Sequence, residues 1–289
     1  MATTTASPES TRADRGTSAH GEAPTTLEGW YVLHDIVTVD WGRWNDVPAD
    51  DRARIVTEAT SVVARQEQPE NGHSASFSLL TQKGDMAFLH YRRDLEGLRA
   101  AELELRRTRL WAFLRPAYSY LSVVELGTYE LRPWAAQTLA KRGVDPEHPG
   151  YEEALHAAMM EAAHDRLFLS VPAKRYFCFY PMSKRRGEQV NWYALSGQER
   201  AAYMRGHGII GRKYAGRVVQ VICGSVGFDD WEWGVTLFAD DPLVFKKLVY
   251  EMRFDPASSQ FALFGPFYVG IRMQAGDLAA VLDGRAPRT

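Results

Sequence analysis

The chain has 289 residues, of which 45% are hydrophobic and 12% aromatic, and this composition supports one large or two small folded domains with a substantial core. Its 34 basic and 36 acidic residues give a formal net charge of −2, which excludes a global electrostatic footprint for binding nucleic acid or an anionic membrane. The two cysteines have no CxxC spacing, and no apolar run reaches the roughly 20 residues that a membrane span needs. We therefore expect buried thiols, no membrane partner and a cytoplasmic protein.

The first half of the chain predicts one ferredoxin-like unit. Residues 1–26 contain no Leu, Ile, Val or aromatic residue, which predicts a disordered tail. Hydrophobic periodicity then predicts, in order, a strand (29–41), a helix (50–67), two strands (74–80 and 85–92), a helix (94–114) and a strand (119–130). This order is typical of a split β-α-β unit, so we expect residues 27–131 to form an N-terminal ferredoxin-like half.

The second half repeats the pattern after a connection. Residues 132–166 hold a Pro- and Gly-bearing stretch and a helical segment, which indicates a crossover. Over 167–282 we expect a strand (175–182), a helix (196–214) with Ser196 as N-cap, paired strands (218–225 and 231–238), a helix (241–255) and a strand (261–273). Residues 283–289 are expected to be a flexible tail. The predicted class is α+β: two fused ferredoxin-like repeats form a barrel of the dimeric α+β type, with antiparallel sheets around an internal pocket.

One strand of the second half carries unusual chemistry. In RYFCFYPMSK the alternation places Tyr176, Cys178, Tyr180 and Met182 on one face, and Lys184 extends that face. Cations bracket the strand, and no acid occurs between residues 166 and 187. A lone tyrosine usually only packs its ring, and a charge run is usually a solvated face. Cations around an aromatic strand also suit a ligand with several carboxylates, so both interpretations stay open.

Three further residues extend this group. His207 shares an apolar helix face with Tyr203 and Ile210, and glycines at 206, 208 and 211 leave room for a flat ligand, although a core histidine is the alternative. Gln220 is either tied to a neighbouring strand or turned toward a bound ligand, because a buried amide without a partner costs about 1–3 kcal/mol. Arg253 either forms an exposed salt bridge or holds a carboxylate. A histidine that can ligate iron, a tyrosine that can carry a radical, and cations for propionates together indicate an iron porphyrin site.

Several motifs in a fixed order carry a family resemblance. YPMSKRR, NWYAL, ER followed by HGIIGRKYAG, GSVGFDDWEWGVTLFADDPLVFKKLVYEMRFD and FGPFYVG resemble the coproheme decarboxylase branch of the chlorite dismutase superfamily, over residues 27–275. The resemblance implies a hydrogen peroxide-dependent haem synthase that converts Fe-coproporphyrin III (coproheme) to haem b through a monovinyl intermediate, in the last step of coproporphyrin-dependent haem biosynthesis. Coproheme is then both substrate and redox cofactor, with no separate metal. A homopentamer and a transient contact with a coproporphyrin ferrochelatase are also implied.

The resemblance assigns roles to individual residues, with a Firmicutes-type active site. It implies that His207 is the proximal iron ligand, that Tyr180 is the catalytic tyrosine and that Gln220 is the distal residue. Lys184 is then a group near a reacting propionate, and Met182 is a substrate contact. The implied anchors for propionates are Arg166, Arg253 and Ser258. Actinobacterial members use a distal histidine, so His164 is an alternative to Gln220. Chlorite dismutase and a non-catalytic haem-binding or sensing protein are alternative functions. Chlorite dismutases are expected to have a distal arginine where this chain has Gln220. A non-catalytic haem-binding function leaves Tyr180 and Lys184 unexplained.

Overall fold

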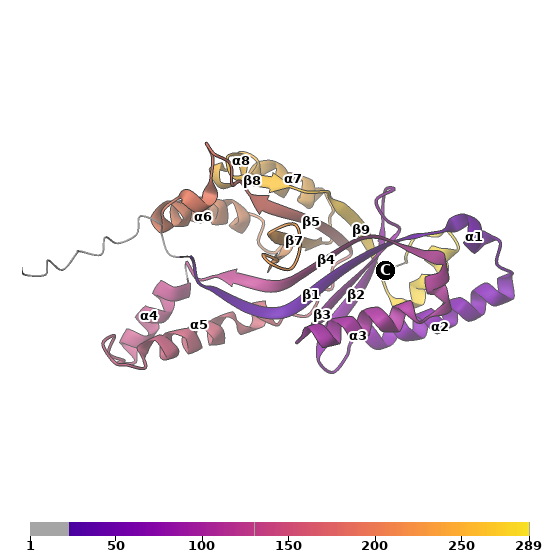
Figure 1. The fold of residues 1–289 in the computed structure, drawn as a ribbon, viewed down its shortest axis with the longest axis horizontal. Helices are drawn as coiled ribbons and strands as arrows, with labels where there is room; N and C mark the ends of the chain where they lie inside the picture. Colours follow the sequence, from indigo (N-terminus) through magenta and orange to yellow (C-terminus); the bar gives the residue numbers. More distant parts are fainter. Residues whose placement is uncertain (1–22, 130, 289) are drawn as a thin grey trace, which may run out of the picture.

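The strands form one antiparallel sheet that closes on itself. The computed structural model describes residues 23–129 and 131–288. Its strands are β1 (Thr26–Val39), β2 (Gly72–Leu79), β3 (Met86–Arg92), β4 (Leu114–Gly127), β5 (Tyr176–Lys184), β6 (Val219–Gly224), β7 (Trp233–Ala239), β8 (Ala262–Phe264) and β9 (Tyr268–Met273). The order around the ring is β7-β6-β4-β1-β3-β2-β9-β5, and β5 pairs again with β7 (Figure 1). The fold is therefore a barrel whose backbone groups are satisfied by neighbouring strands on both sides.

The helices cover the outside of the barrel. They are α1 (Trp41–Asn45), α2 (Ala49–Glu67), α3 (Leu95–Arg106), α4 (Leu131–Lys141), α5 (Tyr151–Leu167), α6 (Gly197–Arg212), α7 (Leu243–Met252), α8 (Pro256–Ser259) and α9 (Leu278–Leu282). In Figure 1, α2 and α3 lie along the strands of the first half, whereas α6, α7 and α8 lie over β5 and β7. The two halves meet where β4 pairs with β6 and where β2 pairs with β9. The predicted α+β class, with two ferredoxin-like repeats and antiparallel pairing, is confirmed.

The interior of the barrel is filled by side chains. Phe177 and Phe179 of β5 point inward, where Phe177 stacks on Phe77 at 4.3 Å between ring centroids and Phe179 stacks on the His34 ring at 4.0 Å. Their alternate neighbours Cys178 and Tyr180 face outward, toward α6 and α7. The prediction of an internal pocket is therefore wrong. A barrel of this size has an interior just wide enough to be filled by side chains. The candidate site lies instead on the outer face.

The last predicted strand is broken, and the break shapes this outer face. β8 pairs with the end of β5, at Met182↔Phe264, whereas β9 pairs with its beginning, at Phe179↔Tyr268. The three residues from Gly265 to Phe267 thus lie opposite two residues of β5, which is a bulge. A Cβ on Gly265 would lie 2.7 Å from the Pro181 ring, so only glycine fits this close approach.

Other elements differ from expectation at their ends or in number. The helix predicted over 94–114 ends at Arg106 and is followed by a 3₁₀ turn at Arg109–Phe113. The segment 132–166, expected as a crossover with one helix, contains α4 as well as α5. The short helices α1 and α9 were not predicted, because five residues are too few for periodicity to register. The tail expected over 1–26 lies, up to residue 22, outside the described residues, and β1 begins at Thr26.

Candidate functional site

Tyr180 lies at the centre of the outer face of the second half. Its side chain is buried, with a relative exposure of 8%, and its ring stacks on Phe267 of the bulge at 4.4 Å between centroids. Burial, and secondarily the neighbouring Cys178, raise the pKa of the Tyr180 phenol well above its ordinary value, against the opposing effect of Arg253. Tyr180 is therefore a neutral phenol at physiological pH, with its hydrogen available for transfer.

Lys184, four residues further along the same face, is a partly desolvated ammonium group. Its Nζ donates a hydrogen bond to the carbonyl of Ala257 at 2.9 Å and lies 4.2 Å from the centroid of the Trp192 ring. Burial lowers the pKa of Lys184 to about 8, although the carboxylates of Asp255 and Glu232 partly offset this effect. Lys184 can therefore hold an anion and also release a proton near neutral pH.

Helix α6 presents His207 to the same region. The helix begins with the predicted cap: the Ser196 Oγ accepts from the backbone N–H of Glu199 at 3.3 Å, and the Glu199 carboxylate accepts from the Ser196 N–H at 2.8 Å. At its other end the His207 Nδ1 lies 2.8 Å from the Oδ2 of Asp255, whose side chain is only 2% exposed. A carboxylate accepts hydrogen bonds, so Nδ1 carries the proton and the Nε2 lone pair is free to bind a metal.

The turn between α7 and α8 connects these side chains. The Arg253 guanidinium lies 3.8 Å from the centroid of Phe264, and the Phe264 ring is 5.9 Å from the Tyr180 ring. The Ser258 hydroxyl donates to Asp255 Oδ2 at 3.4 Å, which places Ser258 and His207 on the same carboxylate oxygen. Within this short stretch of chain the turn therefore contacts both the strand that carries Tyr180 and the helix that carries His207.

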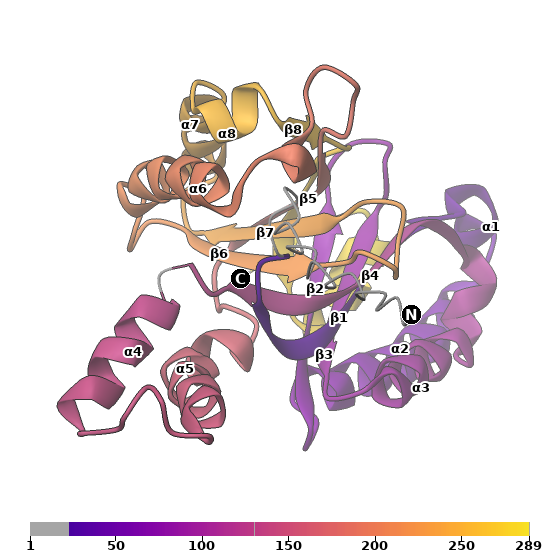
Figure 2. The same cartoon turned by 60° about the vertical axis from the view of Figure 1, so that its left-hand side comes forward.

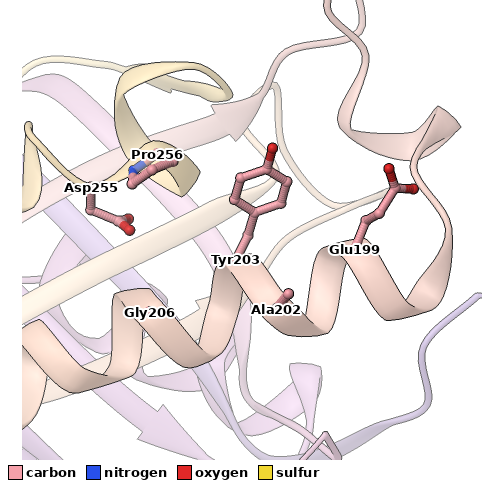
Figure 3. Close-up of a pocket in the computed structure, with 6 residues that line it drawn as sticks. All are labelled: Glu199, Ala202, Tyr203, Gly206, Asp255 and Pro256. Carbon is pink, nitrogen blue, oxygen red and sulfur yellow. The ribbon is translucent and has the colours of Figure 1, made fainter.

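A cavity opens beside this turn. Its volume is about 370 Å³, and it is lined by Glu199, Ala202, Tyr203, Gly206, Asp255 and Pro256. In Figure 3 the Asp255 carboxylate points toward α6, on the side where Gly206 has no side chain. The cavity thus lies along the flank of the helix that carries Gly206, whereas Gly208 and Gly211 lie on the other flank.

Gln220, Arg166 and His164 lie apart from this group. Gln220 of β6 is exposed, so the expectation of a buried amide is wrong; α6 and α7 cover β5 and β7 and leave Gln220 in solvent. It nevertheless belongs to the same outer face, because it pairs with Leu237, which pairs in turn with Cys178. Arg166 and His164 are exposed in the last turn of α5. Figure 2 shows β6 and β4 running between α6 and the α4–α5 pair.

Sequence reasoning missed several groups that shape the site. Asp255 follows Arg253 by two residues, but nothing in the local pattern ties it to a histidine 48 positions earlier. Phe267 and Trp192 belong to the motifs FGPFYVG and NWYAL, yet their contacts with Tyr180 and Lys184 depend on a bulge and a loop. These contacts come from tertiary structure, which strand and helix periodicity does not reveal.

This protein is thus a closed antiparallel barrel of two ferredoxin-like halves, and its second half carries a carboxylate-paired histidine. The chain belongs to the chlorite dismutase family, whose model matches residues 52–273. It is 43% identical over 253 residues to the coproheme decarboxylase of Staphylococcus saprophyticus subsp. saprophyticus, and the match covers 86% of this chain and 94% of that protein.

Two further relatives are named for heme binding. A candidate heme-binding protein of Haloquadratum walsbyi is 43% identical over 271 residues, which is 92% of this chain and 48% of the relative, so this chain spans about half the length of that protein. Among solved structures, a heme-binding protein from Thermus thermophilus matches with a TM-score of 0.77 and 42% identity, covering 91% of this chain and 98% of that one. Among the helices that the structure describes, none has the length and apolar character needed to cross a membrane.

Proposed function

We propose that this protein binds coproheme against the outer face of its second half and converts it to haem b with hydrogen peroxide. The observation that carries the proposal is the connection between His207 and Lys184. The Asp255 carboxylate holds the His207 Nδ1, and two residues later the Ala257 carbonyl holds the Lys184 ammonium. A metal-binding imidazole and an anion-binding cation are thereby fixed by one turn, next to the strand that carries Tyr180. The identity to a coproheme decarboxylase over most of both chains supports the same reaction.

The residues present fit an iron porphyrin. An imidazole with a free Nε2 suits the iron, and the cations Lys184 and Arg253 suit propionates. On the flank of α6 that would face the ring, the two glycines are in contact only with the ends of flexible side chains: a Cβ on Gly208 would meet the end of the Arg212 side chain at 3.4 Å, and a Cβ on Gly211 would meet the methyl of Met252 at 3.5 Å. A flat ring can therefore approach the helix backbone closely.

In the proposed reaction the substrate supplies iron that activates peroxide, and the protein supplies positioning and hydrogen transfer. Tyr180 gives its phenolic hydrogen atom to the oxidant formed from peroxide and then takes one from the β-carbon of a propionate. Loss of carbon dioxide and of a second electron, which the same oxidant takes up, leaves a vinyl group. Each propionate therefore consumes one hydrogen peroxide and one proton and yields one carbon dioxide and two waters. Lys184 holds the carboxylate and can deliver that proton, because burial places its pKa at about 8.

The remaining residues are proposed to orient the ring. Arg253 and Ser258 anchor propionates, and Met182 lines the substrate on the strand face next to Tyr180. Gln220 is proposed as the distal residue, because it belongs to the same sheet face as Cys178 and is open to solvent in the ligand-free protein. Arg166 is proposed as a peripheral anchor that reaches the ligand from α5. A homopentamer and a transient contact with a coproporphyrin ferrochelatase complete the proposal.

Substitution of Tyr180 tests the proposed reaction. Tyr180→Phe removes the transferable hydrogen but keeps the ring that stacks on Phe267. We expect it to bind coproheme as the wild type does and to form no haem b when peroxide is added. Tyr250→Phe, at an exposed tyrosine of α7, is the matched control and should turn over normally. An undiminished yield of haem b from Tyr180→Phe would refute the assigned role.

Chlorite decomposition and haem carriage without turnover are separated from this reaction by two simple assays. Oxygen evolution from chlorite by the haem-loaded protein would support the first, and tight haem binding with no change in the porphyrin after peroxide addition would support the second. We expect neither result, because neither function needs a buried phenol and a partly desolvated lysine on the same face of one strand.

A further inference from the structure

We propose that Ser258, acting through Asp255, makes the strength of the His207–iron bond depend on whether a substrate carboxylate is present. This inference rests on the proposed function and adds to it a means by which the protein distinguishes substrate from product. Ser258 is here a positioning residue for the iron ligand as well as an anchor for a propionate.

One oxygen atom of Asp255 accepts two hydrogen bonds. Asp255 Oδ2 accepts from His207 Nδ1 at 2.8 Å and from the Ser258 hydroxyl at 3.4 Å. Asp255 and Ser258 are buried, with exposures of 3% and 6%, so water competes little for these bonds. Two donors on one oxygen each withdraw electron density from it, and each weakens the other's bond. The Ser258 bond is the longer of the two and is the easier one to give up.

The Ser258 hydroxyl has one proton and can serve one acceptor at a time. A propionate carboxylate within its reach offers a charge-assisted bond that is shorter and stronger than the 3.4 Å contact with Asp255. When Ser258 turns to the propionate, Asp255 Oδ2 keeps only its bond to His207. That bond strengthens, the imidazole becomes more basic, and Nε2 becomes a better ligand for iron.

In this proposal the propionate that Ser258 holds is one of the two that react, so decarboxylation reverses this change. After the carboxylate beside Ser258 has left as carbon dioxide, the vinyl group that remains accepts no hydrogen bond from the hydroxyl. Ser258 then returns to Asp255, the bond between Asp255 and His207 weakens, and so does the bond from His207 to iron. The protein thus holds the substrate more firmly than the product, and the weakened bond favours release of haem b.

The turn is built so that the Ser258 hydroxyl can move without disturbing its backbone. The backbone N–H of Ser258 and that of Ser259 both donate to the Asp255 carbonyl, at 3.0 and 2.8 Å. Lys184 donates to a neighbouring carbonyl, that of Ala257. The main chain is therefore fixed while one side-chain torsion decides which acceptor the hydroxyl serves. Ser259 lies in the same short helix but is exposed, and it offers a matched control.

The test is the iron–histidine stretching frequency of the ferrous protein, measured by resonance Raman spectroscopy with coproheme and with haem b. In the wild type we expect a higher frequency with coproheme. In Ser258→Ala the frequency should be high and equal for both porphyrins, and haem b should bind about tenfold more tightly than in the wild type, the scale expected for a partner of a metal ligand. Ser259→Ala should behave as the wild type.

The outcomes separate this inference from the proposed function. Equal frequencies in the wild type, or a wild-type difference that persists in Ser258→Ala, would overturn the inference even if decarboxylation proceeds. A frequency difference without any decarboxylation would support the inference and refute the proposed reaction. Failure of the wild type to bind either porphyrin through His207 would overturn both.

Discussion

Replacing Lys184 by methionine should make the ligand-free protein more stable at neutral pH while abolishing decarboxylation. The folded protein lowers the pKa of Lys184 from 10.5 to about 8. At 1.36 kcal/mol per pH unit, keeping this ammonium charged in the folded state costs about 3 kcal/mol. Methionine removes that cost but also removes the hydrogen bond to Ala257 and the contact with Trp192, each worth about 1 kcal/mol. We expect Lys184→Met to raise the free energy of unfolding by roughly 1 kcal/mol at pH 7.

The difference in stability between Lys184→Met and the wild type should depend on pH. Because the folded pKa lies below the unfolded one, the unfolded chain binds more protons between pH 8 and 10.5. The cost is therefore fully present below pH 8 and disappears as the pH rises toward 10.5, so the wild type gains stability over this window. Lys184→Met lacks that gain. At 1.36 kcal/mol per pH unit the gain of the wild type exceeds the roughly 1 kcal/mol advantage of the variant by about pH 9, so the order of stability should reverse there.

Urea unfolding of the ligand-free protein at pH 7 and near pH 9.5, followed by circular dichroism, measures the effect. Lys141→Met, at an exposed lysine that ends α4, is the control and should be close to the wild type at both pH values. The reasoning is refuted if Lys184→Met is less stable than the wild type at pH 7, or if the difference between the two proteins does not change with pH. Either result would mean that the ammonium is well solvated in the folded protein.

Further predictions concern the helix flank, the first half and the distal side. Gly208→Ala should stabilise the ligand-free protein by about 0.5–1 kcal/mol in thermal unfolding, because alanine favours the helix, whereas Gly208→Leu should weaken coproheme binding in a spectroscopic titration. Burial and the neighbouring Glu102 raise the pKa of Asp35 to about 6, above its unfolded value, so wild-type stability should fall as the pH rises from about 4 to 6. Asp35→Asn should lack that fall and be about 3 kcal/mol more stable at pH 7 in urea unfolding. Gln220→Ala should slow peroxide-driven turnover more than His164→Ala, and the opposite ranking in stopped-flow assays would move the distal role to α5.

The sequence was most informative where local rules act. Alternation along β5 correctly separated the inward Phe177 and Phe179 from the outward Cys178 and Tyr180, because side chains of a strand point to opposite faces. Ser196 was correctly identified as the start of α6, because its side chain and that of Glu199 satisfy each other's backbone N–H groups.

Features that depend on distant contacts were not predictable. Closure of the barrel depends on β5 pairing with both β7 and β9, and no local pattern specifies two partners for one strand. Side chains fill the interior of the closed barrel, so the candidate site lies on the outer face and not in the predicted internal pocket. The pairing of His207 with Asp255 and the exposure of Gln220 likewise depend on how α6, α7 and α8 settle on the sheet.

The central claim is that coproheme binds through His207 with a propionate in reach of Tyr180. The most direct test is to load the protein with coproheme, add hydrogen peroxide in stepwise equivalents without oxygen, and measure the mass of the porphyrin after each addition. We predict the loss of one carboxyl group for each equivalent of peroxide, in two successive steps that end at haem b. Consumption of peroxide while all four propionates remain on the porphyrin would contradict the account.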